Sequence, residues 1–409
     1  MKKVLFTIAL LLAAGFSSAQ VKNVKQAKSL AEDVKPNFAE AQKLIDEALE
    51  NAETKGQADT WNVAALIQKK INEKEIEKAY LRQPYDTLKS YNSLYKMMNY
   101  FLKCDELEQV PNEKGKVKFK YRKNNAATIM IERPNLINGG SQFYNLGKNK
   151  EALDFFGMYV DLAKAPMLEK EELAKKDTLL SMVSFYACLS ASRMNDYPNA
   201  VKYGTIAKND KTNGQDAMQL IAEAYKGMKD TVNWVQTLKE GVQTYPSSPY
   251  FFGYLIDYYS NSNKFADAMS FADQMIAKDP KNAYYLYVKG YLYQSMKNYD
   301  QAIEFYKKTI EVDPNNAEAY SNLGIAYWSQ AVDYESKLTL NLNDPKYKGE
   351  QAKIKKFYEN AKPFLEKAKE LKPNNKELWL NGLYTVYYKL GIGGPEFDEL
   401  AKEVEKAGK

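Results

Sequence analysis

The sequence predicts an all-α fold in which antiparallel helix pairs stack in a row. The first supporting observation is periodicity: in residues 282–316, residues such as Leu286, Gly290 and Tyr293 recur at spacings of four and three, which is typical of one face of an α-helix. The second is that a short polar turn divides two such patterns, and Pro314 ends the second one because proline cannot continue a helix. The third is that this unit recurs along the chain at a fixed period, as in stacked helical arrays.

The recurrence fixes where each helix pair begins. Each repeat starts 34 residues after the one before it, at Ser181, Gln215, Pro249, Ala283 and Ala317. A single hairpin cannot bury its own apolar face, so neighbouring hairpins must stack. Small residues such as Gly290 and Ala302 are expected where the two helices of a hairpin approach closely.

The repeat that begins at Ala283 resembles the tetratricopeptide repeat family. The family pattern is matched at Gly290, Tyr293, Ala302, Tyr306 and Pro314, while Leu286 replaces an aromatic residue and Thr309 replaces a small one. The resemblance covers residues 181–373 and is looser outside them. It implies a right-handed α-solenoid of stacked helix-turn-helix repeats, with about nine helix pairs over the whole chain.

The segment 1–19 predicts a secretory signal peptide. Lys2 and Lys3 form a basic start, residues 4–14 form an apolar run, and small residues at 17–19 form a cleavage site that leaves Gln20 as the new N-terminus. An uncleaved membrane anchor is the alternative, but the apolar run is short for a transmembrane helix. We therefore expect an exported protein, in the periplasm or in an extracellular or outer-membrane-associated location.

Composition excludes several functional classes. Without Lys2 and Lys3, the 58 basic residues become 56 and face 52 acidic ones, which does not indicate a nucleic-acid-binding protein. Histidine, the usual general base and the commonest metal ligand, is absent. The sequence also lacks the phosphate-binding, metalloprotease, nucleophile-elbow and paired-cysteine motifs. We therefore expect no enzymatic activity, no cofactor and no metal.

The two cysteines are not expected to form a disulfide bond. Cys104 and Cys188 are widely separated in the sequence, and each repeat of a linear array contacts only its neighbours. Cys188 occupies the small position of its repeat, where a buried apolar residue is expected.

The N-terminal part, residues 20–165, is predicted to hold divergent helix pairs. A first pair spans 21–53, and a long helix then runs from about Trp61 to Leu81 before its partner at 85–107. Another helix is expected over 124–146, followed by its own partner.

The regular array is predicted for residues 166–373, with insertions at 166–180 and 330–358. The first insertion should contain a short charged helix. The second should extend both helices of its repeat and place their turn at 341–348. The final helix pair and a charged cap are expected over 374–409.

Residues 116–122 alternate basic and apolar side chains. A period of two predicts an extended or strand-like segment. Its basic edge could meet an anionic partner such as lipid headgroups or an acidic glycan. The alternative is a solvated edge with Val117, Phe119 and Tyr121 tucked against helices.

The family resemblance implies a concave binding surface on the first helix of each repeat. At the matching positions, the candidate partner-binding residues are Phe185, Arg193, Lys226, Tyr250, Asp257, Tyr284, Tyr287, Tyr291 and Trp328. The tyrosines can stack on peptide side chains or sugar rings while offering hydroxyl groups.

These observations give two functional hypotheses. The first is a non-enzymatic scaffold of the bacterial cell envelope that binds a peptide or protein segment in the concave groove. The alternative is a glycan-binding accessory protein of the envelope. Neither requires a cofactor, a nucleic acid or a membrane-spanning helix.

Overall fold

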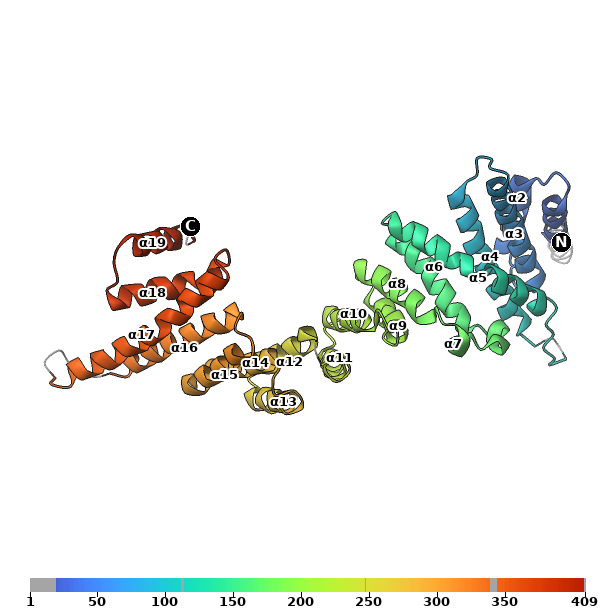
Figure 1. The fold of residues 1–409 in the computed structure, drawn as a ribbon. Helices are drawn as coiled ribbons and strands as arrows, with labels where there is room; N and C mark the ends of the chain where they lie inside the picture. The colour runs from blue at the N-terminus through green and yellow to red at the C-terminus, as the bar shows by residue number, and fades with distance from the viewer. Residues whose placement is uncertain (1–19, 112–113, 247, 339–343, 408–409) are drawn as a thin grey trace, which may run out of the picture. The chain divides into compact units, whose positions relative to one another are not determined.

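The computed structural model describes residues 20–111, 114–246, 248–338 and 344–407, and the predicted signal peptide lies outside these ranges. Every regular element in the described ranges is helical, and successive helices pack as antiparallel pairs, as α16 and α17 do in Figure 1. The predicted all-α fold of stacked helix pairs is therefore confirmed. The chain divides into two compact units, which we call unit 1 (to Gly241) and unit 2 (from Val242). None of the described helices is long and apolar enough to cross a membrane.

Unit 1 begins with a helix over residues 20–32 and continues with helices of very different lengths. Its elements are α2 (Phe38–Glu50), α3 (Ala58–Tyr80), α4 (Thr87–Glu108), α5 (Arg122–Asn145), α6 (Asn149–Asp161), the 3-10 helices η1 (Leu162–Lys164) and η2 (Pro166–Glu171), α7 (Leu173–Lys176), α8 (Leu180–Arg193), α9 (Tyr197–Ala207) and α10 (Gly214–Gly227). Helix α11 (Thr231–Thr244) crosses the boundary between the units. The long helix expected from Trp61 is α3, and its expected partner is α4.

Unit 2 holds the most regular pairs and ends in longer helices. Its elements are α12 (Pro249–Asn261), α13 (Phe265–Lys278), α14 (Ala283–Ser295), α15 (Tyr299–Val312), α16 (Ala317–Ser336), α17 (Tyr347–Leu371), η3 (Lys376–Leu378), α18 (Leu380–Leu390) and α19 (Pro395–Ala407). Helices α16 and α17 have 20 and 25 residues, against 13 and 14 in the preceding pair. The insertion therefore extends both helices as predicted. The predicted turn at 341–348 lies partly outside the described residues, and α17 has already begun at Tyr347.

The turn within each hairpin repeats with the same backbone geometry. Asn195, Lys229, Asn263 and Lys297 stand one repeat apart from each other, and all have positive φ values of 54–59°. One left-handed residue reverses the chain between the two helices of a pair. The next residue then caps the second helix in several repeats, as Asp196 does by accepting the N–H of Asn199.

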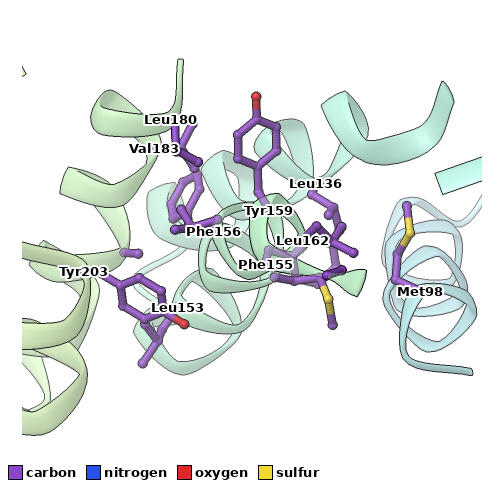
Figure 2. Packing of buried hydrophobic residues seen from close by; sticks show 14 of the residues in the cluster. Met98, Leu136, Leu153, Phe155, Phe156, Tyr159, Leu162, Leu180, Val183 and Tyr203 are labelled. Atoms are coloured by element: carbon purple, nitrogen blue, oxygen red, sulfur yellow. The ribbon is translucent and has the colours of Figure 1, made fainter. Parts of the chain in front are cut away.

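Glycines permit close helix approach in the core of unit 1. A Cβ atom on Gly139 would lie 2.4 Å from the Phe155 ring, and one on Gly140 would lie 2.6 Å from the Phe156 ring. Figure 2 shows Phe155 and Phe156 surrounded by other buried residues of this cluster, including Leu162. Helices α5 and α6 therefore pack closely because α5 has no side chain at these two positions.

The first insertion differs from its prediction. Instead of one charged helix over 166–177, the chain forms η2 and the short α7, and Met167, Leu168 and Leu173 are buried in the core of unit 1. The charged residues of this segment predict exposure. Its three large apolar side chains, however, are stabilised when they leave water, and this holds the segment against the core.

The basic segment at 116–122 also differs from its prediction. It forms no strand, although residues 116–119 have no helical structure. Val117 and Phe119 are 43% and 46% exposed, so the alternative of a solvated edge holds, but these two side chains are not tucked against helices. Only Tyr121 is partly buried, with its hydroxyl donating to Asp59. The segment is held at its end instead, because Glu108 accepts the backbone N–H groups of residues 120–122.

The cysteines are separate and enclosed. Cys104 and Cys188 are both buried and unpaired. Burial raises the pKa of each thiol to about 12, so both remain protonated and unreactive at neutral pH.

A buried carboxylate links α3 to the start of α4. Glu75 is 2% exposed. It accepts hydrogen bonds from Lys78 at 2.9 Å and from the Asp86 N–H at 3.1 Å, while Lys89 lies 3.3 Å away. Burial alone would raise the pKa of Glu75, but these partners together hold it below the usual value of 4.5. The ionised carboxylate therefore stabilises the folded state.

We expect Glu75→Gln to lower the free energy of unfolding at pH 7. Because the folded pKa of Glu75 is lowered, its contribution is present above about pH 4.5 and is lost as the pH falls through the folded pKa. Urea unfolding at several pH values should therefore show the two proteins converging in acid. Glu77→Gln, at an exposed residue of the same helix, is the control and should show little difference at any pH. A difference between wild type and Glu75→Gln that stays constant into strong acid would contradict this account.

Candidate functional site

Two equivalent turns in unit 2 position the candidate site. The segments 279–282 and 313–316 each contain Asp-Pro-x-Asn, one repeat apart. In each, the asparagine caps the following helix: Asn282 accepts the N–H of Tyr284 at 3.1 Å, and Asn316 accepts the N–H of Ala319 at 2.9 Å. Each asparagine also donates its side-chain amide to the aspartate at the start of its own turn, at 3.2 Å. The two aspartates are thus held in the same orientation at the starts of α14 and α16.

A cleft of about 600 Å³ lies between these turns. Its walls carry two aromatic rings, those of Tyr284 and Tyr287. Its charged lining residues are Asp279, Asp313, Glu318 and Lys281. The cleft therefore combines two tyrosines with three carboxylates and one ammonium group.

Tyr284 leans onto the preceding repeat. Its ring makes an edge contact with Phe252 at 5.8 Å, and its hydroxyl lies 3.4 Å from the Pro249 carbonyl oxygen. The hydroxyl occupies the space above Gly253, where a Cβ would come within 2.8 Å. Burial raises the pKa of Tyr284, and the nearby carboxylate of Asp257 raises it further.

Tyr287 is fixed by the following repeat. Asn322 of α16 donates its side-chain N–H to the Tyr287 hydroxyl at 2.7 Å, and the ring packs on Tyr306 at 5.8 Å between centroids. Burial raises the pKa of Tyr287 to about 12, with the charge of Glu318 as the next cause. The phenol is therefore neutral near pH 7 and offers a rigid ring and a hydroxyl.

The charge in the cleft favours a cationic ligand. The negative charge of Glu318 is partly balanced by Lys372, whose Nζ lies 3.1 Å from the Glu318 carboxylate. This ion pair is largely open to solvent. Aspartate and tyrosine together suit a lysine or arginine side chain, because the carboxylates attract it and the ring faces interact with it. Among the described residues, these three carboxylates included, no group of three acidic, cysteine or histidine side chains is placed closely enough to hold one metal ion.

The structure separates the other predicted residues of unit 2. Tyr291 lies one turn after Tyr287 on α14 and is exposed. Trp328 lines a different hollow of about 300 Å³ together with Tyr299. Tyr250 pairs with Tyr254 of its own helix at 4.7 Å. Among these predicted residues, Tyr284 and Tyr287 are the pair that meets in the cleft between the two turns.

The three predicted residues of unit 1 have different environments. Phe185 is 8% exposed and packs in a small apolar cluster with Ala207 and Ala217, so the prediction of a groove-lining ring is wrong for this residue. The next helices cover it. Arg193 is exposed and lies over the Tyr144 ring at 4.4 Å. Lys226 is exposed on α10.

The carboxylates of the turns were missing from the predicted site. The pattern at Asp313 and Pro314 predicts only a helix stop, and no motif singled out Asp279. The available signal was the recurrence of Asp-Pro-x-Asn one period apart, which keeps a carboxylate at the same place in two successive turns. Repetition of a polar residue in an array predicts a shared surface as well as a shared turn.

Comparison with known proteins gives one sequence match and several structural ones. Residues 290–330 match the family profile described as TPR repeat. No curated protein matches the chain significantly.

The solved structures that are similar to this chain include a TPR repeats protein from Bacteroides fragilis, with 21% identity, 63% of this chain and 98% of that chain covered, and a TM-score of 0.35. The C-terminal part of a TPR repeat-containing protein from Cytophaga hutchinsonii has 15% identity, coverage of 64% and 92%, and a TM-score of 0.40. MamA from Desulfovibrio magneticus has 14% identity, coverage of 48% and 96%, and a TM-score of 0.32.

Proposed function

This chain carries tetratricopeptide repeats, and from that premise we propose that it is a non-enzymatic scaffold whose unit 2 binds a basic segment of a partner protein. The fold is generally one of protein-interaction scaffolds. Beyond this general role, we propose where the partner binds and which side chains it presents. The partner segment lies over the cleft of Tyr284 and Tyr287 and presents lysine or arginine side chains to it.

The observation that carries this proposal is the juxtaposition of fixed rings and carboxylates. Asp279 and Asp313 are oriented by asparagine side chains, and Tyr287 is held by Asn322. A preorganised site loses little side-chain entropy on binding. Tyrosine and arginine are also among the residue types that contribute most strongly to protein interfaces.

An enzymatic role has little support in the same geometry. The neutral phenol of Tyr287 is not activated as a nucleophile, since its pKa is raised to about 12. The chain also has no histidine to serve as a general base.

We also propose that the scaffold is exported to the bacterial cell envelope, with the periplasm as its working compartment. The support is the basic start, apolar run and small-residue site within residues 1–19. Expression of the full chain in a Gram-negative host, followed by osmotic shock and N-terminal sequencing, tests this. A mature N-terminus at Gln20 in the periplasmic fraction is expected, and an intact N-terminus in the cytosol would contradict it.

The binding proposal is tested by selecting peptides from a random twelve-residue display library on the mature chain. We expect the selected peptides to be enriched in lysine and arginine and to bind more weakly at high salt. The triple variant Asp279→Asn, Asp313→Asn, Glu318→Gln should then weaken their binding by about tenfold, because three solvent-accessible charge interactions of up to about 1 kcal/mol each are removed. Fluorescence anisotropy of labelled peptides gives the dissociation constants.

A matched control removes three carboxylates elsewhere in unit 2. Asp267, Glu304 and Glu311 are exposed on α13 and α15, and their replacement by Asn, Gln and Gln changes the net charge equally. This variant should bind within about twofold of wild type. Equal binding by both triple variants, or enrichment of acidic peptides, would contradict the proposal.

A further inference from the structure

A second hollow lies in unit 1, lined by the end of α3, the start of α4 and one residue of α5. Its volume is about 430 Å³, within the range of roughly 300–1,000 Å³ that is usual for small-molecule sites. Asn72, Ile76 and Ala79 form its α3 wall at helical spacing, and Thr87, Ser90, Tyr91 and Leu94 form its α4 wall in the same way. Asn135 closes it from α5.

The floor of this pocket is rigid. Asn72 is 3% exposed, and its side-chain oxygen accepts the Ser90 hydroxyl at 2.6 Å. Tyr91 is wedged between Phe143 and Phe155, with centroid distances of 6.4 and 6.1 Å. The polar and aromatic groups at the bottom are therefore held in place before any ligand arrives.

Two aromatic side chains at the rim of the pocket are exposed and do not pack in the hydrophobic core. Tyr80 is 86% exposed and Tyr85 is 51% exposed, and both line the pocket. The loop that carries Tyr85 is tied down at both ends: the Gln83 N–H donates to the Lys78 carbonyl at 2.9 Å, and the Asp86 N–H donates to Glu75. Two exposed aromatic residues beside a hollow, one at the end of α3 and one on a fixed loop, are typical of a recognition surface.

The chemistry of the lining selects a ligand class. Among the described residues that line the pocket, none is charged; the polar groups are amides and hydroxyls, and the apolar ones are tyrosine rings and aliphatic side chains in equal number. A charged ligand would lose its hydration without gaining a counter-ion. A purely apolar ligand would place hydrocarbon against the hydroxyls and amides of the lining, of which only the Asn72 oxygen and Ser90 hydroxyl are bonded to each other. A sugar fits both features, since its C–H face stacks on a tyrosine and its hydroxyls bond to amides.

We infer that this pocket of unit 1 binds a neutral carbohydrate. The inference does not depend on the peptide-binding proposal for unit 2, because the two sites share no residue. Tyr80 and Tyr85 hold the sugar ring at the rim, and Asn72 and Ser90 contact its hydroxyls. Asn135, whose amide donates to Glu132 at 2.9 Å and accepts from Asn138 at 3.3 Å, closes the pocket from α5.

The test uses the mature full chain and four neutral tetrasaccharides as probes: maltotetraose, cellotetraose, xylotetraose and mannotetraose. Isothermal titration calorimetry should show that at least one binds at millimolar concentration or below. The double variant Tyr80→Ala, Tyr85→Ala should weaken that binding by about tenfold or more, since two stacking rings are removed. Both side chains are exposed, so the variant should retain the wild-type helical circular dichroism.

The control is Tyr388→Ala, which removes an exposed ring, 67% accessible, from α18 of unit 2. It should bind the sugar as wild type does, as should the triple carboxylate variant described above. The inference is overturned if none of the four tetrasaccharides binds, or if the Tyr80 and Tyr85 double variant binds as tightly as wild type.

Discussion

Gly290→Val should destabilise unit 2 by about 2–3 kcal/mol, the cost of forcing extra atoms into a filled core. A Cβ at this position of α14 would lie 2.8 Å from two carbon atoms of the Tyr306 ring. That ring has no room to retreat, because Tyr306 is fully buried and its hydroxyl donates to the Gln294 side-chain oxygen at 2.7 Å. The substitution therefore separates α14 from α15 and disturbs a pair within the regular array.

Gly349→Val is the matched control. Gly349 lies in α17, and a Cβ there meets no atom within 4 Å. Valine is a better helix former than glycine, so this variant should be as stable as wild type or slightly more stable. Urea unfolding followed by circular dichroism measures both. Equal stability of the two variants would show that the close approach at Gly290 is unimportant.

Asp177→Ala should destabilise unit 1 by about 3–5 kcal/mol, because it leaves a buried guanidinium without its counter-ion. The Asp177 carboxylate lies 2.6 Å from Arg133, and both side chains are less than a tenth exposed. Arg133 also donates two hydrogen bonds to the Tyr159 carbonyl, at 3.0 and 3.1 Å. One arginine thus joins α5, α6 and the end of the first insertion.

A double-mutant cycle separates the pair from its surroundings. Arg133→Met with Asp177→Ala should be less destabilised than the sum of the two single variants, because neither charge is then left alone. Glu304→Ala breaks the exposed ion pair with Lys308 and should leave the unfolding curve nearly unchanged, since solvent screens such pairs. Strict additivity of the Arg133 and Asp177 variants would contradict a buried interaction between them.

The register of the repeats could be predicted from the sequence because it depends on a period. The predicted starts at Ser181, Gln215, Pro249, Ala283 and Ala317 lie at or within one residue of the first residues of α8, α10, α12, α14 and α16. Close helix approach requires small residues at fixed intervals, so the spacing carries the information. The left-handed turn residues, such as Asn195 and Lys229, follow the same period but differ in residue type.

Other features depend on contacts that no local pattern contains. The charged residues of 166–177 predict an exposed helix, yet Leu168 is buried against helices distant in sequence. The repeat position of Phe185 predicts a place on the binding surface, but it does not reveal the helices that cover this ring. The spacing within one helix predicts that Tyr284 and Tyr287 share a face. It does not predict the hydrogen bond from Asn322 to Tyr287, because that bond joins two repeats.

The most direct measurement of the central claim is hydrogen–deuterium exchange of residues 20–409 with and without a peptide from the display selection. Binding in the tyrosine and carboxylate cleft predicts slower exchange in residues 279–291 and 313–322, and no such protection in the triple carboxylate variant. Protection confined to unit 1, or unchanged protection in that variant, would contradict the assignment of the partner site to unit 2.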